Sequence, residues 1–255
     1  MLEVKNLGFS YNKVKTLNNI NFRVRRREFS CLLGANGSGK TTILKCLNGV
    51  LDKDEGKVKI DQTDLDDLNQ RQIAQYISMV PQEHSVVFSY RVLDVVTMGA
   101  TPYLGFGKMP GQKHYDRAFQ ILAKLDIEHL ADRQYNQLSG GEKQLVLIAR
   151  ALMQDTGYLI MDEPTSHLDF KNKNLLMREI KKLTRNSETG VIMALHDPNL
   201  AMKYCDRVII VKEGAIMADG DANEILTGQN LGDAYGIDIK INEKARGIEI
   251  ALPEI

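Results

Sequence analysis

The stretch Gly34-Ala35-Asn36-Gly37-Ser38-Gly39-Lys40-Thr41-Thr42 decides the fold, because it matches the pattern G-x-x-x-x-G-K-[ST]. Apolar residues 29 and 31–33 precede it as a short buried strand, and apolar residues 43, 44 and 47 follow it at helical spacing. Glycines let the backbone curl so that successive N–H groups point inward, and the start of the helix adds partial positive charge there. The stretch therefore predicts a phosphate-binding loop between a strand and a helix.

Two side chains of this loop carry the expected chemistry. Lys40 would reach the β and γ phosphates of a nucleotide, and the Thr41 hydroxyl would ligate Mg²⁺. A chain of this length matches the pattern by chance with odds of roughly 1%. The strand before the loop and the helix after it lower those odds further, so we expect nucleotide binding.

Size and composition fit one large α/β domain, or two lobes that share a core. The chain has 255 residues, of which 43% are hydrophobic and 26% charged, enough to bury a sizeable core. Its net charge is zero, so it lacks the basic excess that binding to nucleic-acid phosphates would use. Three cysteines without metal-ligand spacing favour reduced thiols in a cytosolic compartment: Cys31, Cys46 and Cys205.

Membrane segments are not expected in this sequence. No apolar run approaches the length that spans a bilayer, and residues 1–5 lack the layout of a secretion signal. If the protein works at a membrane, we expect another chain to supply the membrane-spanning segments.

Two single side chains before residue 85 are candidates for ligand contacts. Residues 2–33 suggest antiparallel strands, with Tyr11 in a loop where its ring offers a flat face to an adenine. Residues 76–80 form a predicted core strand that Pro81 ends, and Gln82 follows at once. A strand end is a common ligand position, so Gln82 is a candidate for Mg²⁺ or the attacking water; the alternative is an ordinary turn residue.

A predicted helical insertion over residues 86–154 ends in a second glycine-rich helix start. Ser139 is a natural N-cap, and Glu142 three residues later completes a capping box, which is a purely structural interpretation. Gly140 and Gly141 exceed what a cap requires. They leave N–H groups exposed at a helix start, which is a second phosphate-binding geometry.

Acidic and imidazole groups follow two further core strands. The apolar strand 158–161 ends in Asp162 and Glu163, which point to opposite sides and suit different tasks. Asp162 would hold Mg²⁺, and Glu163 would orient and deprotonate the attacking water. His196 ends strand 190–195 at the same sheet edge, where an imidazole would contact a γ phosphate or that water. A surface acidic pair and a structural histidine are the alternatives.

The remaining segments suggest only scaffold. Helices are predicted over 64–75 and about 171–185, and a hairpin surrounds residues 212–214. The tail from about residue 222 has one short helix and a weak strand pair, 237–241 with 247–252, and its sequence indicates no chemistry.

In this order, the motifs resemble those of the nucleotide-binding subunit of ATP-binding cassette (ABC) transporters over nearly the whole chain. The resemblance identifies Tyr11 as the adenine-stacking aromatic, residues 34–42 as Walker A, Gln82 as the Q-loop glutamine and residues 138–142 as the signature motif. It further identifies residues 158–162 as Walker B, Glu163 as the catalytic glutamate, residues 166–169 as the D-loop with Asp169, and His196 as the switch histidine. One departure is Glu142, where the usual signature has glutamine.

The fold implied by this resemblance is α/β: a P-loop NTPase (RecA-like) core with an N-terminal antiparallel β subdomain and a helical insertion. The single ABC ATPase domain, 1–255, then divides into a core lobe of residues 1–85 and 155–225, a helical subdomain of residues 86–154 and a tail of residues 226–255. Two copies would form a head-to-tail sandwich in which each ATP lies between Walker A of one copy and the signature helix of the other.

The resemblance also implies a set of site residues. The catalytic residues would be Lys40, Gln82, Glu163 and His196, with Mg²⁺ held by Thr41, Gln82 and Asp162. ATP would be bound by Tyr11, Asn36, Gly37, Ser38, Gly39, Lys40, Thr41 and Thr42, and by Ser139, Gly140, Gly141 and Glu142 of the opposite subunit.

Segments 80–105 and 225–235 are similar to importers of iron–siderophore, haem, cobalamin and related metal chelates. That similarity implies an ATPase on the cytoplasmic face of the membrane, working with permease subunits and an extracytoplasmic substrate-binding protein. Three alternatives stay open: an exporter subunit, a soluble ABC ATPase acting on nucleic acid or ribosomes, and a P-loop kinase or switch GTPase. The first differs only in transport direction, and the signature motif and His196 have no role in the last.

Overall fold

A six-stranded sheet forms the centre of the protein. The computed structural model describes residues 1–82, 89–105, 107–166, 168–242 and 247–250. The sheet has the order β10-β9-β3-β8-β7-β6, and every neighbouring pair is parallel except the antiparallel pair β9–β10. Its strands are β3 (Phe29–Leu33), β6 (Ile77–Val80), β7 (Tyr158–Asp162), β8 (Gly190–Leu195), β9 (Arg207–Lys212) and β10 (Ala215–Asp221).

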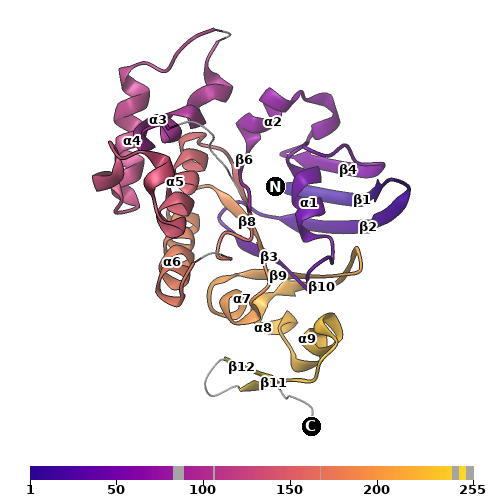
Figure 1. Ribbon diagram of the computed structural model, residues 1–255. Coiled ribbons are helices and arrows are strands. Elements are labelled where there is room, and N and C mark those ends of the chain that lie inside the picture. Colours follow the sequence, from indigo (N-terminus) through magenta and orange to yellow (C-terminus); the bar gives the residue numbers. More distant parts are fainter. Residues whose placement is uncertain (83–88, 106, 167, 243–246, 251–255) are drawn as a thin grey trace.

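A second, antiparallel sheet has the order β2-β1-β4-β5. It consists of β1 (Leu2–Tyr11), β2 (Val14–Val24), β4 (Glu55–Ile60) and β5 (Thr63–Asp64). Alternate residues of β1 and β2 point into one core, which they share with Ile43 and Leu44 of helix α1 (Lys40–Leu47). Helix α1 therefore lies between the two sheets (Figure 1).

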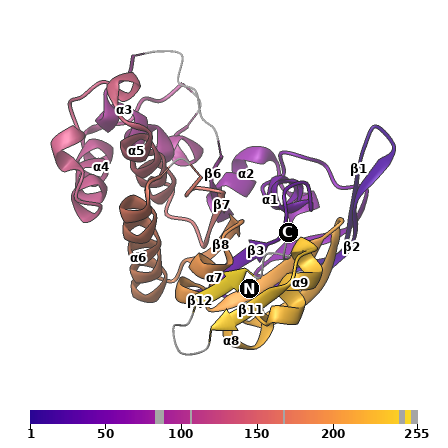
Figure 2. The same cartoon turned by 60° about the horizontal axis from the view of Figure 1, so that its bottom comes forward.

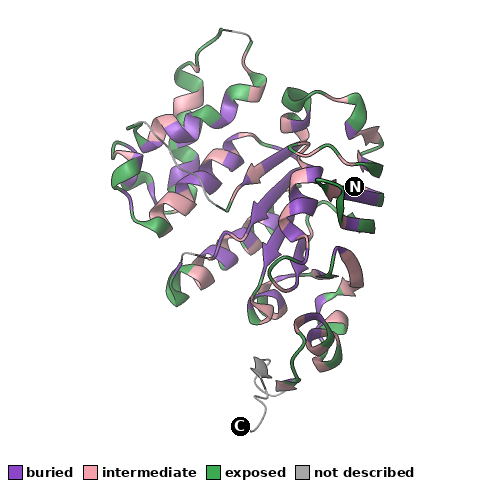
Figure 3. Cartoon of the chain, turned by 45° about the vertical axis from the view of Figure 1, so that its right-hand side comes forward, coloured by how far each residue is buried: buried purple, intermediate pink, exposed green. Residues whose placement is uncertain are grey.

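The helical subdomain lies on the other side of the central sheet, in magenta in Figure 1. Its elements are α3 (Val92–Thr97), η2 (Met98–Tyr103), α4 (Gln112–Lys124), η3 (Glu128–Leu130), η4 (Tyr135–Gln137) and α5 (Gly140–Met153). It shares a second apolar core with α6 (Phe170–Asn186) and with the facing side chains of the sheet. The strands between the two cores are the most deeply buried part of the molecule (Figure 3).

Side chains of the central strands alternate between the two cores. In β7, Ile160 points to the core with α1, whereas Leu159 and Met161 point to the core with the helical subdomain. Strands covered on both faces read as continuous apolar runs, which is how 158–161 and 190–195 were predicted. Helices that lie within the described ranges are too short or too polar to cross a bilayer.

The remaining elements cover the ends of this arrangement. They are η1 (Leu65–Asp67), α2 (Gln70–Tyr76), α7 (Pro198–Tyr204), α8 (Ala222–Ile225), α9 (Gly228–Tyr235), β11 (Ile239–Asn242) and β12 (Gly247–Ile250). Figure 2 shows α7, α8, α9, β11 and β12 gathered below the central sheet. The three cysteines are buried and form no disulfide, as the sequence predicted.

Three local predictions need correction. Tyr11 is the last residue of strand β1 rather than a loop residue. The predicted helix 64–75 is split, because Asn69 is extended and caps the new helix α2 by accepting the Gln72 N–H at 3.0 Å. Strand β11 runs from Ile239 to Asn242 instead of over 237–241. The expected end of its partner strand at residues 251–252, like His167 of the D-loop, lies outside the described residues.

Candidate functional site

A cavity of about 430 Å³ lies at the edge where the parallel strands end. The loops after β3, β6 and β7 contribute to it, which is the usual ligand position in such sheets. Its lining residues are Thr16, Asn36, Gly37, Gly39, Lys40, Thr41, Thr42, Gln82 and Glu163. The cavity therefore joins the predicted phosphate loop to two of the predicted catalytic residues.

The loop adopts a backbone that its glycines allow. Gly37 and Gly39 have φ angles of 78° and 108°, which other residues rarely adopt. Helix α1 begins directly after Gly39 and has no side-chain cap. Its first N–H groups, which lie at the cavity, are therefore not used by a capping side chain. The buried Ser38 hydroxyl also has no hydrogen-bond partner among the described residues. Unused donors at a helix start are what a phosphate group binds.

Lys40 is held inside this loop. Its side chain is 4% exposed, and its Nζ donates to the carbonyls of Gly34 at 2.9 Å and Ala35 at 3.0 Å. Burial lowers the pKa of Lys40, and the nearby carboxylates of Glu163 and Asp162 raise it in part again. Among the described residues, this buried ammonium is held by two carbonyls and by a carboxylate 3.9 Å away, so it is well placed to bind an incoming phosphate.

Asp162 and Thr41 form a pair at the end of β7. The Thr41 hydroxyl donates to Asp162 Oδ1 at 2.9 Å, and the aspartate is 3% exposed. Burial raises the pKa of Asp162, while the Thr41 hydrogen bond lowers it in part. Among the described residues, no group of three or more His, Cys, Asp or Glu side chains is placed to hold a metal ion.

One carboxylate and one hydroxyl nevertheless fit Mg²⁺, which is commonly held by one or two carboxylates together with substrate phosphates and water. Gln82, the third predicted ligand, also lines this cavity. The donor set therefore fits a magnesium ion that arrives with a nucleotide rather than one that resides permanently in the protein.

Three side chains converge on the Glu163 carboxylate. Gln82 Nε2 donates to Glu163 Oε2 at 3.2 Å, and His196 Nδ1 lies 3.8 Å from the same oxygen. Lys40 Nζ approaches the other oxygen at 3.9 Å. The backbone of Glu163 has a φ of 47°, an uncommon value for a residue with a side chain and one that clusters at functional positions. Residues 40, 82, 163 and 196, separated widely in sequence, thus surround one point.

The signature segment lies apart from this cavity. Ser139 and Glu142 form the predicted capping box: Glu142 Oε2 accepts the Ser139 N–H at 2.8 Å and its hydroxyl at 2.7 Å. These bonds to Ser139 lower the pKa of Glu142. An acid at position 142 therefore completes the cap, and none of residues 139–142 lines the phosphate cavity.

Asp169 and Tyr11 also stay outside the cavity lining, as do Ser38, Asp162 and His196. Asp169 caps α6 by accepting the Asn172 N–H at 2.7 Å, close to Gly141, whose added Cβ would lie 3.3 Å from Leu168. Tyr11 is 42% exposed and packs edge-on against Phe9 with ring centroids 4.7 Å apart. Adenine stacking on Tyr11 stays a prediction.

Sequence reasoning missed two supports of the site. Gly214, in the β9–β10 turn, donates its N–H to the Ser38 carbonyl at 3.0 Å and accepts from the Asn18 N–H at 2.8 Å. The Tyr235 hydroxyl of α9 donates to the His196 carbonyl at 3.1 Å. For the Gly214 contact, the sequence offered only a glycine in a predicted turn. For the Tyr235 contact, it offered no local pattern.

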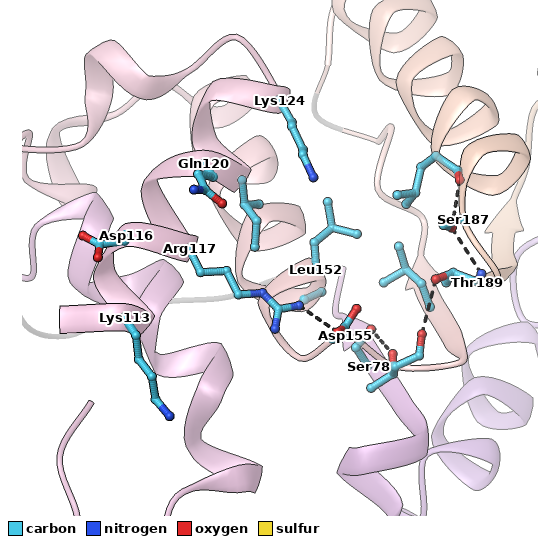
Figure 4. Close-up of a pocket in the computed structure, with 15 residues that line it drawn as sticks. Ser78, Lys113, Asp116, Arg117, Gln120, Lys124, Leu152, Asp155, Ser187 and Thr189 are labelled. Carbon is cyan, nitrogen blue, oxygen red and sulfur yellow. Dashed lines mark hydrogen bonds and ion pairs between the residues drawn. The ribbon is translucent and has the colours of Figure 1, made fainter. Parts of the chain in front are cut away.

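A separate cavity of about 570 Å³ lies between α4 and the opposite edge of the central sheet (Figure 4). The Arg117–Asp155 ion pair, 2.9 Å long, and the bond from the Thr156 hydroxyl to Ser78 lie along its wall. Ser78, Thr156 and Thr189 lie near the starts of β6, β7 and β8, so this cavity and the phosphate loop occupy opposite strand ends.

Comparisons with known proteins agree with this geometry. The family described as ABC transporter matches residues 17–166, more than half of the chain. A probable iron chelatin transport ATP-binding protein of Helicobacter pylori is 39% identical over 236 residues, which cover 92% of each protein.

Solved structures are similar over most of their length. An inward-facing metal-chelate type ABC transporter, described as putative, contains a chain with a TM-score of 0.87 and 30% identity, covering 98% of this chain and 97% of that one. A dimeric ATP-binding cassette in a post-hydrolysis state, bound to ADP and phosphate, has a TM-score of 0.77 and 30% identity, covering 87% of this chain and 99% of that one.

Proposed function

Because this chain belongs to the ABC transporter family and is an ATPase of that family, we propose that it binds MgATP at the 430 Å³ cavity and hydrolyses it there to drive a separate membrane permease. The observation that supports this most directly is the convergence of Lys40, Gln82 and His196 on the Glu163 carboxylate beside the phosphate loop. Hydrolysis of a phosphoanhydride needs a positioned water, a base and positive charge around the γ phosphoryl group, and these residue types supply them.

Each residue has a distinct proposed task. The N–H groups of residues 36–42 and the Lys40 ammonium bind the phosphates, and the Glu163 carboxylate accepts a proton from the attacking water. Gln82 and His196 orient the carboxylate and that water. When bound, Mg²⁺ neutralises phosphate charge; Thr41, Asp162 and Gln82 would hold it.

A second copy of the chain completes the proposed site. Ser139, Gly140, Gly141 and Glu142 begin a helix with exposed N–H groups but do not reach the cavity of their own chain. In a head-to-tail pair they face the partner's γ phosphate, with Asp169 nearby. The similar cassette that is dimeric with ADP and phosphate bound supports the pairing of two copies.

The proposed membrane partner docks on the helical subdomain. Exposed apolar side chains gather there in one stretch of chain, with Met98 39%, Tyr103 50% and Met109 85% exposed. Several exposed apolar side chains close together in the chain would supply the apolar part of such an interface. The protein would then lie on the cytoplasmic face of the membrane, peripheral to the permease.

The proposed cargo is an iron–siderophore, haem or similar metal chelate. The Helicobacter relative is named for iron chelatin transport, and the similar solved transporter is of metal-chelate type. Import from an extracytoplasmic substrate-binding protein is the corresponding direction. Proteoliposomes of the co-purified permease test this: uptake of a labelled ferric siderophore or haem that depends on MgATP supports import, and ATP-dependent efflux would favour an exporter.

The experiment for the site itself is Glu163→Gln. Removal of the base should abolish turnover while ATP binding persists, so the variant should accumulate an ATP-bound dimer that light scattering detects. Hydrolysis at the parental rate would contradict the assignment of Glu163. Binding of RNA instead of a membrane partner would favour the nucleic-acid alternative.

A further inference from the structure

Tyr235 joins the C-terminal tail to the proposed catalytic centre. Its hydroxyl donates to the backbone carbonyl of His196 at 3.1 Å, and it stands at the end of helix α9. Leu231 and Ala234 of the same helix are 0% and 6% exposed and pack into the core that also holds Leu195 of β8. Both partners of this hydrogen bond are therefore anchored by buried neighbours.

The surroundings of Tyr235 link it to β3, the strand that precedes the phosphate loop, as well. Burial raises the pKa of Tyr235, and nearby Cys31 and Asp197 add to the rise. Tyr235 also packs against the apolar core that contains Cys31 and Leu33 of β3. A phenol whose pKa is at or above the ordinary value of about 10 is protonated at neutral pH, so the hydroxyl is a donor there.

We propose that Tyr235 is a positioning residue that fixes the backbone at His196 and so aims its imidazole at Glu163 and the attacking water. The need for such a support is visible in the site. The His196 side chain is 42% exposed, and its Nδ1 lies 3.8 Å from Glu163 Oε2, beyond hydrogen-bond distance. A backbone anchor reduces the range of positions that the imidazole samples. The inference rests on the proposed role of His196.

The test is Tyr235→Phe, which removes only the hydroxyl. Tyr204→Phe is the matched control, because the Tyr204 hydroxyl donates to Asn174 Oδ1 at 2.9 Å in the same apolar core but away from the site. We expect Tyr235→Phe to lower kcat for MgATP about fivefold, the effect of one net hydrogen bond, with KM unchanged. Tyr204→Phe should keep the parental kcat, and the two variants should melt at similar temperatures.

A double-mutant cycle separates this inference from the site on which it rests. In a His196→Ala background, Tyr235→Phe should cause no further loss of kcat, because the side chain that it positions is gone. A parental rate for His196→Ala would overturn the proposed site and this inference together. If His196→Ala is impaired, an unchanged kcat in Tyr235→Phe alone, or the same fivefold loss in the double variant, overturns the inference and leaves the site intact.

Discussion

Ser139→Ala should separate the structural role of the signature segment from its role in hydrolysis. Its hydroxyl donates to Glu142 Oε2 at 2.7 Å and accepts the Glu142 N–H at 3.4 Å, so alanine loses a helix cap. Loss of such a cap costs about 1 kcal/mol of folding free energy. For a chain of this size that lowers Tm by about 2–4 °C. With a total stability of about 5–15 kcal/mol, more than about 99% of the protein stays folded.

Asn69→Ala is the matched control, because Asn69 and Gln72 form an equivalent capping box on α2, away from the phosphate cavity. Differential scanning calorimetry should show a similar decrease in Tm for both variants. Only Ser139→Ala should lose ATP hydrolysis, by about 100-fold, since it removes a donor that faces the partner's γ phosphate. Equal turnover in the two variants, whether both are active or both impaired, would refute a catalytic contribution of Ser139 beyond capping.

Three further predictions concern the phosphate loop. Lys40→Ala should weaken ATP binding at least about tenfold in equilibrium titration, because it removes a charge-assisted contact; unchanged affinity would argue against the cradle. Asp162→Asn should abolish turnover but raise Tm of the nucleotide-free protein. Burial raises the folded pKa of Asp162 above its ordinary value of 3.8, so stability falls as the pH rises from 3.8 through the folded pKa. Urea unfolding in a pH series that starts below 3.8 should show a smaller fall in the variant. Gly214→Ala should destabilise the fold by more than Gly107→Ala. Gly214 has φ 74°, and its added Cβ would lie 2.0 Å from the Thr16 carbonyl; Gly107 has a similar φ of 72° but no described atom within 4 Å of its added Cβ, so its substitution should cost about 1 kcal/mol. Only Gly214→Ala should weaken ATP binding.

The sequence allowed prediction of what lies close along the chain or at strand ends. The loop between a strand and a helix at residues 34–39, the Ser139–Glu142 cap and the core strand 190–195 follow from local patterns, and the structure confirms each of these elements. The shared position of Gln82, Glu163 and His196 followed from the rule that parallel strands end at one edge.

Contacts that depend on tertiary packing were not accessible in the same way. The bond from Gly214 to Ser38 needs a hairpin folded back over the loop, and the bond from Tyr235 to His196 needs the tail docked below the sheet. The sequence around these residues shows no hydrophobic periodicity that would predict either arrangement. The end of β1 at Tyr11 was misplaced because strand pairing with Val14 of β2 extends the strand to the turn.

The alternation of β7 between two cores has a consequence for how the protein can change. Ile160 packs into the core beside α1, the helix that follows the phosphate loop, whereas its neighbours Leu159 and Met161 pack into the core that contains α5, the signature helix. Neighbouring residues of one strand therefore contribute to the packing of two different parts of the protein. Substitution of a β7 side chain that faces one core changes the packing of that core, with little direct effect on the packing of the other.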